Sequence, residues 1–124
     1  MKNILVLDDE KSVRTLCETE LRQEGYSVVS TESCREVERL IESSKPSVVV
    51  FDLRLEDCDT FELLQNTRKH HPELPIILFT AYDSYRNDVR CTAADYYVVK
   101  SFDLTELKET IASAVSKHDH YRIP

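Results

Sequence analysis

Glycine is almost missing from this chain, because Gly25 is the only one among 124 residues. A flavin- or dinucleotide-binding domain needs a loop rich in glycine or hydroxyl residues after its first strand, where the backbone approaches a phosphate. The residues that follow the first apolar run here read "DDEKS", at positions 8–12. These acids would repel a phosphate, so the sequence argues against a nucleotide-binding loop.

Long apolar runs and closely spaced cysteine pairs are also missing. No apolar segment approaches the ~20 residues that cross a bilayer, and no secretory signal is apparent. We therefore expect a cytoplasmic protein with no membrane contact. No C-x-x-C pair occurs, so we expect the four cysteines to be reduced and mostly buried thiols rather than metal ligands or redox groups. They are Cys17, Cys34, Cys58 and Cys91.

Positively charged residues are fewer than negatively charged ones: the chain has 16 Lys and Arg against 23 Asp and Glu, and its formal net charge is -7. Such a balance disfavours a surface that grips nucleic acid phosphates, so we expect no direct nucleic acid contact by this segment. The length suits one domain. We expect this domain over residues 1–118 and a C-terminal tail over 119–124, with His118 and His120 in or beside that tail rather than in a metal site.

Short apolar segments alternate with helical patterns along the chain. Strand-like runs rich in β-branched and aromatic residues occupy 3–8, 26–30, 47–52, 75–80 and 96–100. Helical spacing of apolar residues follows at 13–21, 37–41, 61–64, 85–89 and 104–115. Because the strands are continuously apolar, both faces of the sheet should be buried. We expect a flavodoxin-like (βα)5 three-layer sandwich whose parallel five-stranded sheet has the order 2-1-3-4-5.

Polar groups follow the ends of four of these runs, where ligands bind in open parallel sheets. They are Asp8, Asp9 and Glu10, then Asp52, then Thr80, then Lys100. Crowded carboxylates repel one another unless a cation joins them, and oxygen ligands of this kind suit Mg²⁺. The lysine could reach a carboxylate or a phosphoryl oxygen. Since carboxylates can form aspartyl-phosphates, Asp52 is a candidate nucleophile toward a phosphoryl group.

Four segments carry a family resemblance. In order and spacing, "ILVLDDE", "VVVFDLRL", "IILFTA" and "YYVVKSF" resemble the motifs of the CheY-like receiver domain of two-component response regulators. The resemblance covers nearly the whole chain, from about residue 2 to 117. It implies a phosphoacceptor signalling module, which is not an enzyme in the usual sense although it assists its own phosphotransfer.

The resemblance also implies roles for individual residues. Asp52 would be the phosphoacceptor, and Thr80 and Lys100 would bind the phosphoryl oxygens. Tyr97, three residues before the lysine, matches an aromatic switch whose rotamer follows phosphorylation and works with Thr80. The implied Mg²⁺ ligands are Asp8, Asp9, Asp52 and the backbone carbonyl of Arg54.

Partners are implied in the same way. A sensor histidine kinase or a histidine phosphotransfer protein would donate the phosphoryl group. A downstream effector would read a face made by the expected fourth helix, the fifth strand and the fifth helix, and a second copy of the chain could bind on phosphorylation.

Two residues bear on the lifetime of such a phosphorylated state. In receivers, the positions two after the phosphoacceptor and two after the threonine flank the path of the attacking water, and here they are Arg54 and Tyr82. Both are large, and neither is a carboxylate or an amide that could orient the water. We expect slow autodephosphorylation, while the small Ala81 leaves room for the donor.

Several positions depart from the receiver pattern: Glu56, Thr60 and Ala93 replace a Pro and two Gly, and Ser101 replaces a Pro. The Pro is typically preceded by a cis bond, which before serine would cost ~2.5–4 kcal/mol. One alternative is therefore a degenerate receiver that acts as a phosphorylation-independent interaction module. Another is a phosphohydrolase of the haloacid dehalogenase type, but that family places a second Asp where this chain has Arg54.

Overall fold

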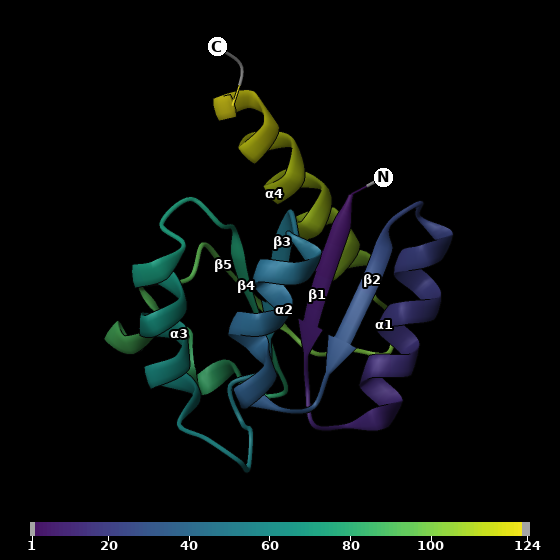
Figure 1. Ribbon diagram of the computed structural model, residues 1–124. Coiled ribbons are helices and arrows are strands. Elements are labelled where there is room, and N and C mark those ends of the chain that lie inside the picture. The colour runs from purple at the N-terminus through teal and green to yellow at the C-terminus, as the bar shows by residue number, and fades with distance from the viewer. Residues whose placement is uncertain (1, 123–124) are drawn as a thin grey trace.

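The computed structural model describes residues 2–122 of the chain, with side chains through Lys117. Its centre is one sheet of five strands in the order β2-β1-β3-β4-β5 (Figure 1). Every neighbouring pair is parallel. This confirms the expected strand order. The strands are β1 (Asn3–Leu7), β2 (Ser27–Thr31), β3 (Val48–Phe51), β4 (Ile76–Thr80) and β5 (Tyr96–Val99).

Helices cover both faces of the sheet, as continuously apolar strands require. Successive β1 residues divide between two cores: Ile4 packs with Cys17 of α1 and Leu107 of α4, whereas Leu5 packs with Ile41 of α2. The sandwich therefore has α1 and α4 on one side and α2 and α3 on the other (Figure 1). The helices are α1 (Lys11–Gln23), α2 (Val37–Ser44), α3 (Thr60–His70) and α4 (Thr105–Arg122).

Short polar side chains cap the predicted helix starts. Asp59 accepts hydrogen bonds from the backbone N–H groups of Phe61 and Glu62 at 3.0 and 3.3 Å, which anchors the first turn of α3. Asp103 likewise accepts from Thr105 N at 2.9 Å before α4. Ser33 caps a 3₁₀ turn, η1 (Cys34–Glu36), which leads into α2.

The prediction of a helix between the fourth and fifth strands is wrong. Residues 81–95, which the structure describes throughout, form two 3₁₀ turns, η2 (Asp83–Tyr85) and η3 (Val89–Cys91), in place of an α-helix. The expectation rested on apolar spacing at Tyr85 and Val89, but Val89 is 77% exposed while Tyr85 packs against the core, so the two residues do not form one buried stripe. Asp88 instead accepts a hydrogen bond from Arg90 N at 2.9 Å, the kind of local contact that competes with a helix.

The two ends of the last helix bear on other expectations. The Lys100–Ser101 peptide bond is trans, so the loop before α4 is built differently from one with a cis proline. The backbone of α4 continues to Arg122, past the expected boundary at residue 118. The side chains of His118 and His120 lie outside the described residues, and the division of the chain at 118 stays a prediction. Within residues 2–122, no helix has the length and apolar character needed to cross a membrane.

The cysteines also depart from expectation. Cys34 and Cys58, 24 residues apart, form a disulfide, whereas Cys17 and Cys91 are free and buried. The expectation of four reduced thiols is wrong for the first pair. Their spacing matches no short motif, and only the packing of η1 against the loop before α3 brings the two sulfurs together.

Candidate functional site

The carboxyl ends of the strands form the site, because the parallel register delivers their polar residues to one edge. Leu7 of β1 lies beside Phe51 of β3, so Asp8 and Asp52 leave the sheet together. Thr80 of β4 lies beside Val99 of β5, directly before Lys100. The backbone N–H of Asp52 donates to Leu7 O at 3.0 Å, which continues the ladder up to the site.

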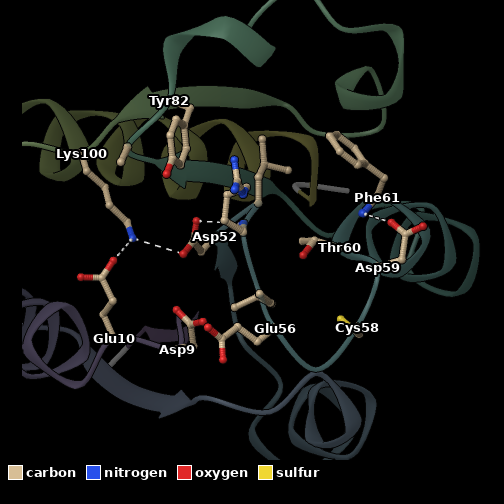
Figure 2. Close-up of a pocket in the computed structure, with 14 residues that line it drawn as sticks. Asp9, Glu10, Asp52, Glu56, Cys58, Asp59, Thr60, Phe61, Tyr82 and Lys100 are labelled. Carbon is tan, nitrogen blue, oxygen red and sulfur yellow. Dashed lines mark hydrogen bonds and ion pairs between the residues drawn. The ribbon is translucent and has the colours of Figure 1, made fainter.

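The Lys100 ammonium is the centre of this cluster. Its Nζ lies 2.7 Å from Asp8 Oδ2 and 3.3 Å from Asp52 Oδ2. A third acid, Glu10, lies further out, with its Oε1 at 3.5 Å from the same nitrogen (Figure 2). Asp8 and Asp52 are only 2% and 4% exposed. One cation is thus shared by two buried carboxylates that come from different strands.

The second oxygen of each buried aspartate is held by the backbone. Asp8 Oδ1 accepts from Glu10 N at 2.9 Å, and Asp52 Oδ1 accepts from Arg54 N at 3.2 Å. Each carboxylate therefore turns one oxygen to a loop N–H and the other to Lys100. This arrangement fixes the orientation of both groups before any ligand arrives.

Burial and charge act in opposite directions on these groups. Burial raises the pKa of Asp8 and of Asp52 above the ordinary value, and the nearby Lys100 only partly offsets the effect. Burial lowers the pKa of Lys100, but the hydrogen bonds and charges of the two aspartates outweigh it, so the pKa is raised overall. The lysine stays an ammonium, and the carboxylates remain short of positive charge.

The donor set fits a hard divalent cation. Asp8, Asp9, Glu10 and Asp52 each offer a carboxylate oxygen, and these atoms all lie within 4.8 Å of one another. Oxygen ligands supplied by one or two carboxylates, with room for water, suit Mg²⁺. Asp9 is half-buried and Glu10 is exposed, so the cluster is open on that side. Glu10 was not among the predicted ligands, although its place next to Asp9 after the first strand was a usable signal.

A cavity of about 530 Å³ opens beside Asp52. Its walls include Tyr82, which Figure 2 labels, together with Arg54 and the small Ala81. The Arg54 guanidinium lies 4.7 Å from the centre of the Tyr82 ring. Thr60, at the start of α3, also lines it, and among the described residues its hydroxyl is the one buried side-chain oxygen or nitrogen with no hydrogen-bond partner. The cavity therefore holds polar groups beyond the acidic cluster.

The two predicted switch residues lie behind this cavity and are joined through one loop. Thr80 is fully buried, and its Oγ1 accepts from Tyr82 N at 3.4 Å. The Tyr97 hydroxyl donates to the backbone carbonyl of the same Tyr82. The Arg86 guanidinium lies 5.0 Å from the centre of the Tyr97 ring. Thr80 and Tyr97 thus both contact the backbone of Tyr82, the first at its N–H and the second at its carbonyl.

A doubly wound parallel α/β domain with a lysine-bridged acidic site at its strand ends is a well-defined class of protein. Residues 4–112 match the family model of the response regulator receiver domain. The chain therefore belongs to the response regulator receiver domain family, a module of two-component signalling.

Similar proteins agree with this assignment. The regulatory protein AtoC of Escherichia coli is 34% identical over 118 residues, which are 93% of this chain and 25% of AtoC. The response regulator TrrA of Thermotoga maritima, solved in complex with Mg²⁺-BeF, is 39% identical, with a TM-score of 0.87 over 92% of this chain and 99% of that one. TrrA was also solved in complex with the histidine kinase ThkA, at 39% identity and a TM-score of 0.86 over 93% of this chain and 99% of that one. The chain spans about a quarter of the length of AtoC.

Replacing the shared cation tests the arrangement directly. We expect Lys100→Met to lower the free energy of unfolding by about 3 kcal/mol, because it leaves two buried carboxylates without a positive partner. Urea unfolding in the presence of a chelator measures this. Lys108, which pairs with Glu20 at 2.7 Å near the surface, is the matched control, and Lys108→Met should change stability little. Equal stability of the two variants would contradict the central role of Lys100.

Proposed function

We propose that this chain is a phosphoacceptor receiver in which Asp52 takes a phosphoryl group from a phosphohistidine. The observation that carries the proposal is the Lys100 ammonium, held between Asp8 and Asp52 at the mouth of an open acidic cavity. A buried, oriented carboxylate next to a cation and an entry path is the arrangement that a phosphoryl acceptor needs.

The residues of the chain divide the work of the transfer. An oxygen of Asp52 attacks phosphorus, the bond from phosphorus to the donor imidazole nitrogen breaks, and the imidazole leaves. The Lys100 ammonium stabilises charge on the phosphoryl oxygens. Asp8, Asp9 and the backbone carbonyl of Arg54 would hold Mg²⁺ together with Asp52. When bound, the ion supplies the positive charge that the carboxylate cluster lacks.

Two other functions fit the site less well. A phosphohydrolase of the haloacid dehalogenase type needs an acid two residues after the nucleophile, but this position is Arg54, which stacks on Tyr82. A degenerate receiver would explain Glu56 and Thr60 in the cavity wall. The close set of Asp8, Asp52 and Lys100 supports working chemistry instead. Since the phosphoryl group would end on the chain itself, we propose a signalling module rather than an enzyme.

The proposed partners follow from the comparisons and the surface. TrrA binds a histidine kinase, which supports a sensor kinase or phosphotransfer protein as the donor, and hence a cytoplasmic location. The fully exposed Phe102, two residues after Lys100, offers such a partner an apolar contact at the edge of the site. An effector, or a second copy of the chain, would bind the face made by η2 and η3, β5 and α4.

Phosphoryl uptake should require both Asp52 and a divalent cation. We expect wild type with Mg²⁺ and a small phosphoryl donor to gain one phosphoryl group by intact mass, and Asp52→Asn or chelator-treated protein to gain none. Without the cation the acidic cluster repels the incoming phosphate. Asp83→Asn, in an exposed turn, is the control and should label normally. Labelling of Asp52→Asn would contradict the assignment of Asp52 as the phosphoacceptor. If no donor labels the wild type, the degenerate interaction module is favoured instead.

The loop that joins Thr80 to Tyr97 supports a switch. A phosphoryl group on Asp52 would draw the Thr80 hydroxyl away from Tyr82 N, and the Tyr97 hydroxyl is bonded to the carbonyl of Tyr82. A movement of the Thr80 hydroxyl would therefore shift the Tyr82 backbone and, through it, the position of the Tyr97 side chain. For this to work, phosphate must prefer one arrangement of the loop over the other.

We expect phosphorylation to shift backbone amide resonances across residues 82–106, since this stretch holds the coupled loop, η2, η3 and β5. Thr80→Ala should still accept the phosphoryl group but lose the shift at Tyr97, because the hydroxyl that links the two is gone. Tyr26→Phe, which alters a tyrosine of the other core, is the control. Unchanged resonances over 82–106 in phosphorylated wild type would rule out coupling through this face.

The stacked pair of Arg54 and Tyr82 supports the expected long lifetime of the phosphorylated state. Both residues line the cavity, and their contact at 4.7 Å places bulk beside the path of attacking water. We expect Arg54→Ala and Tyr82→Ala to decay about three- to tenfold faster than wild type, because water reaches the phosphoryl group more easily. The decay is followed by intact mass after removal of the donor.

Arg90→Ala provides the matched control for this test. It removes a guanidinium that lies 3.9 Å from the centre of the Phe61 ring, and Arg90 itself does not line the cavity. Its decay should equal that of wild type. If neither Arg54→Ala nor Tyr82→Ala decays faster than this control, the two side chains do not shield the site.

A further inference from the structure

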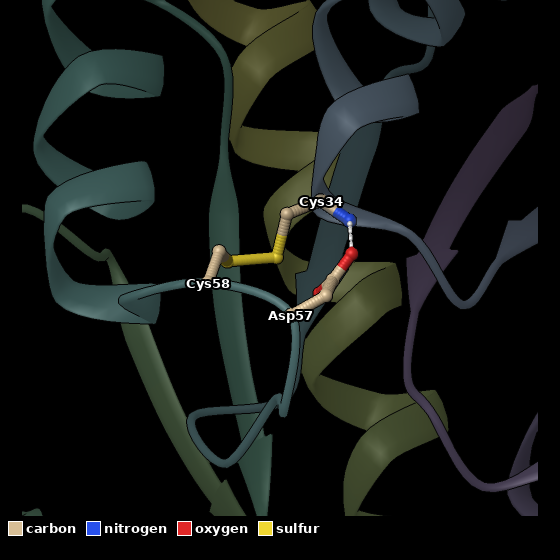
Figure 3. A group of neighbouring side chains, drawn as sticks. All are labelled: Cys34, Asp57 and Cys58. Carbon is tan, nitrogen blue, oxygen red and sulfur yellow. Dashed lines mark hydrogen bonds between the residues drawn. A yellow bond between two sulfur atoms is a disulfide. The ribbon is translucent and has the colours of Figure 1, made fainter.

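The Cys34–Cys58 disulfide lies at the edge of the candidate site (Figure 3). Cys34 begins η1, directly after the loop that follows β2, and Cys58 lies in the loop between β3 and α3. Their Cα atoms are 6.3 Å apart, within the range that a disulfide spans without moving the backbone. The bond therefore joins two loops at the same end of the sheet as Asp52.

Asp57 reinforces the same junction. One of its carboxylate oxygens, Oδ2, accepts from Cys34 N at 3.2 Å (Figure 3). The same oxygen accepts from Ser33 Oγ at 3.3 Å. These contacts do not depend on the disulfide, so the two loops stay neighbours when the sulfurs are reduced. The thiols would then remain close enough to close again without refolding.

The bridged loop is one wall of the cavity. Residues 53–56, Cys58 and Asp59 line it together with Asp52. Cys58 itself precedes Asp59, the residue that caps α3. With the disulfide closed, this wall is covalently joined to η1 at Cys58, and with the disulfide open it is held there by the hydrogen bonds of Asp57 and by the packing of Leu53 and Leu55 in the same core as Cys34.

Cys58 is also the cysteine that solvent reaches. It is half-buried, whereas Cys17, Cys34 and Cys91 are buried. Burial raises the pKa of Cys17 to about 12 and raises that of Cys91 as well, which leaves both as poor thiolates. A thiol reagent would therefore attack the disulfide at the Cys58 sulfur, and in the reduced protein the Cys58 thiolate would attack a disulfide reagent.

We propose that Cys34 and Cys58 form a thiol–disulfide exchange site that sets the cation affinity of the neighbouring acidic cluster. A low-molecular-weight disulfide such as oxidised glutathione reacts with the Cys58 thiolate, forming a mixed disulfide and releasing one thiol. The Cys34 thiolate then displaces the second thiol, so the pair loses two electrons and two protons and the reagent gains them. A dithiol reverses the exchange.

The two states should differ at the acidic cluster because the bridged wall carries Arg54, whose N–H orients Asp52. Closing the disulfide restrains this wall, so the wall loses less conformational entropy when a cation binds. Under reducing conditions the pair would be open, and oxidation would raise the cation affinity of the cluster. The effect on cation binding stands by itself, whereas its consequence for phosphorylation rests on the proposed function.

The test compares the full chain in its two redox states. Wild type is treated with oxidised glutathione or with dithiothreitol, and the free thiols are alkylated after denaturation and counted by mass. We expect two alkylated cysteines in the oxidised protein and four in the reduced one. Mg²⁺ titration by calorimetry should then show about three- to tenfold tighter binding to the oxidised protein.

Variants separate the pair from general oxidation. Cys34→Ser and Cys58→Ser should bind Mg²⁺ like the reduced wild type whatever the treatment, and Cys91→Ala should keep the redox response. Equal Mg²⁺ affinity in the two states of wild type, failure of the pair to oxidise, or Zn²⁺ uptake by the reduced pair that blocks closure would each overturn the proposal. If Mg²⁺ affinity responds but no donor labels Asp52, the proposed function fails and the exchange site stands.

Discussion

The bridge from Lys100 to Asp8 and Asp52 is the contact on which the rest of the site depends. It joins the ends of β1, β3 and β5, although β4 lies between the last two in the sheet. Two buried carboxylates share one ammonium, so the cluster carries an excess of negative charge that the protein does not neutralise by itself. A buried charge without a partner is unfavourable. On the open side of the cluster, where Asp9 lies, the carboxylate oxygens fit a second cation.

Much of this arrangement could be predicted from the sequence because it follows from local rules. Continuous apolar runs define strands buried on both faces, and parallel strands bring the residues after them to one edge. Asp52 after Val48–Phe51 and Lys100 after Tyr96–Val99 were therefore expected at the same edge of the sheet once the strand order was known. The cap at Asp59 was equally local, because it needs only a carboxylate two residues before the backbone N–H group that donates to it.

What could not be predicted depends on tertiary packing. Cys34 and Cys58 are 24 residues apart, and nothing in their spacing shows that η1 lies against the loop before α3. The expected helix after β4 failed because Tyr85 packs inward while Val89 lies in solvent, a difference that apolar spacing alone does not reveal. The position of Glu10 next to Asp9 was visible in the sequence, but its contact with the Lys100 nitrogen depends on the long side chain of Lys100 reaching the start of α1.

The connection between β4 and β5 has a mechanical consequence. An α-helix there would open as one cooperative unit, since each turn shares hydrogen bonds with the next. Instead, η2 is tied by the Asp83–Arg86 pair and η3 by the Asp88–Arg90 pair, so each turn is closed on itself. One backbone hydrogen bond, from Asp88 N to Tyr85 O at 3.0 Å, joins η2 to the start of η3. The connection is thus two short turns linked through one backbone hydrogen bond, and a partner that moves one turn against the other has fewer bonds to break than it would within an α-helix.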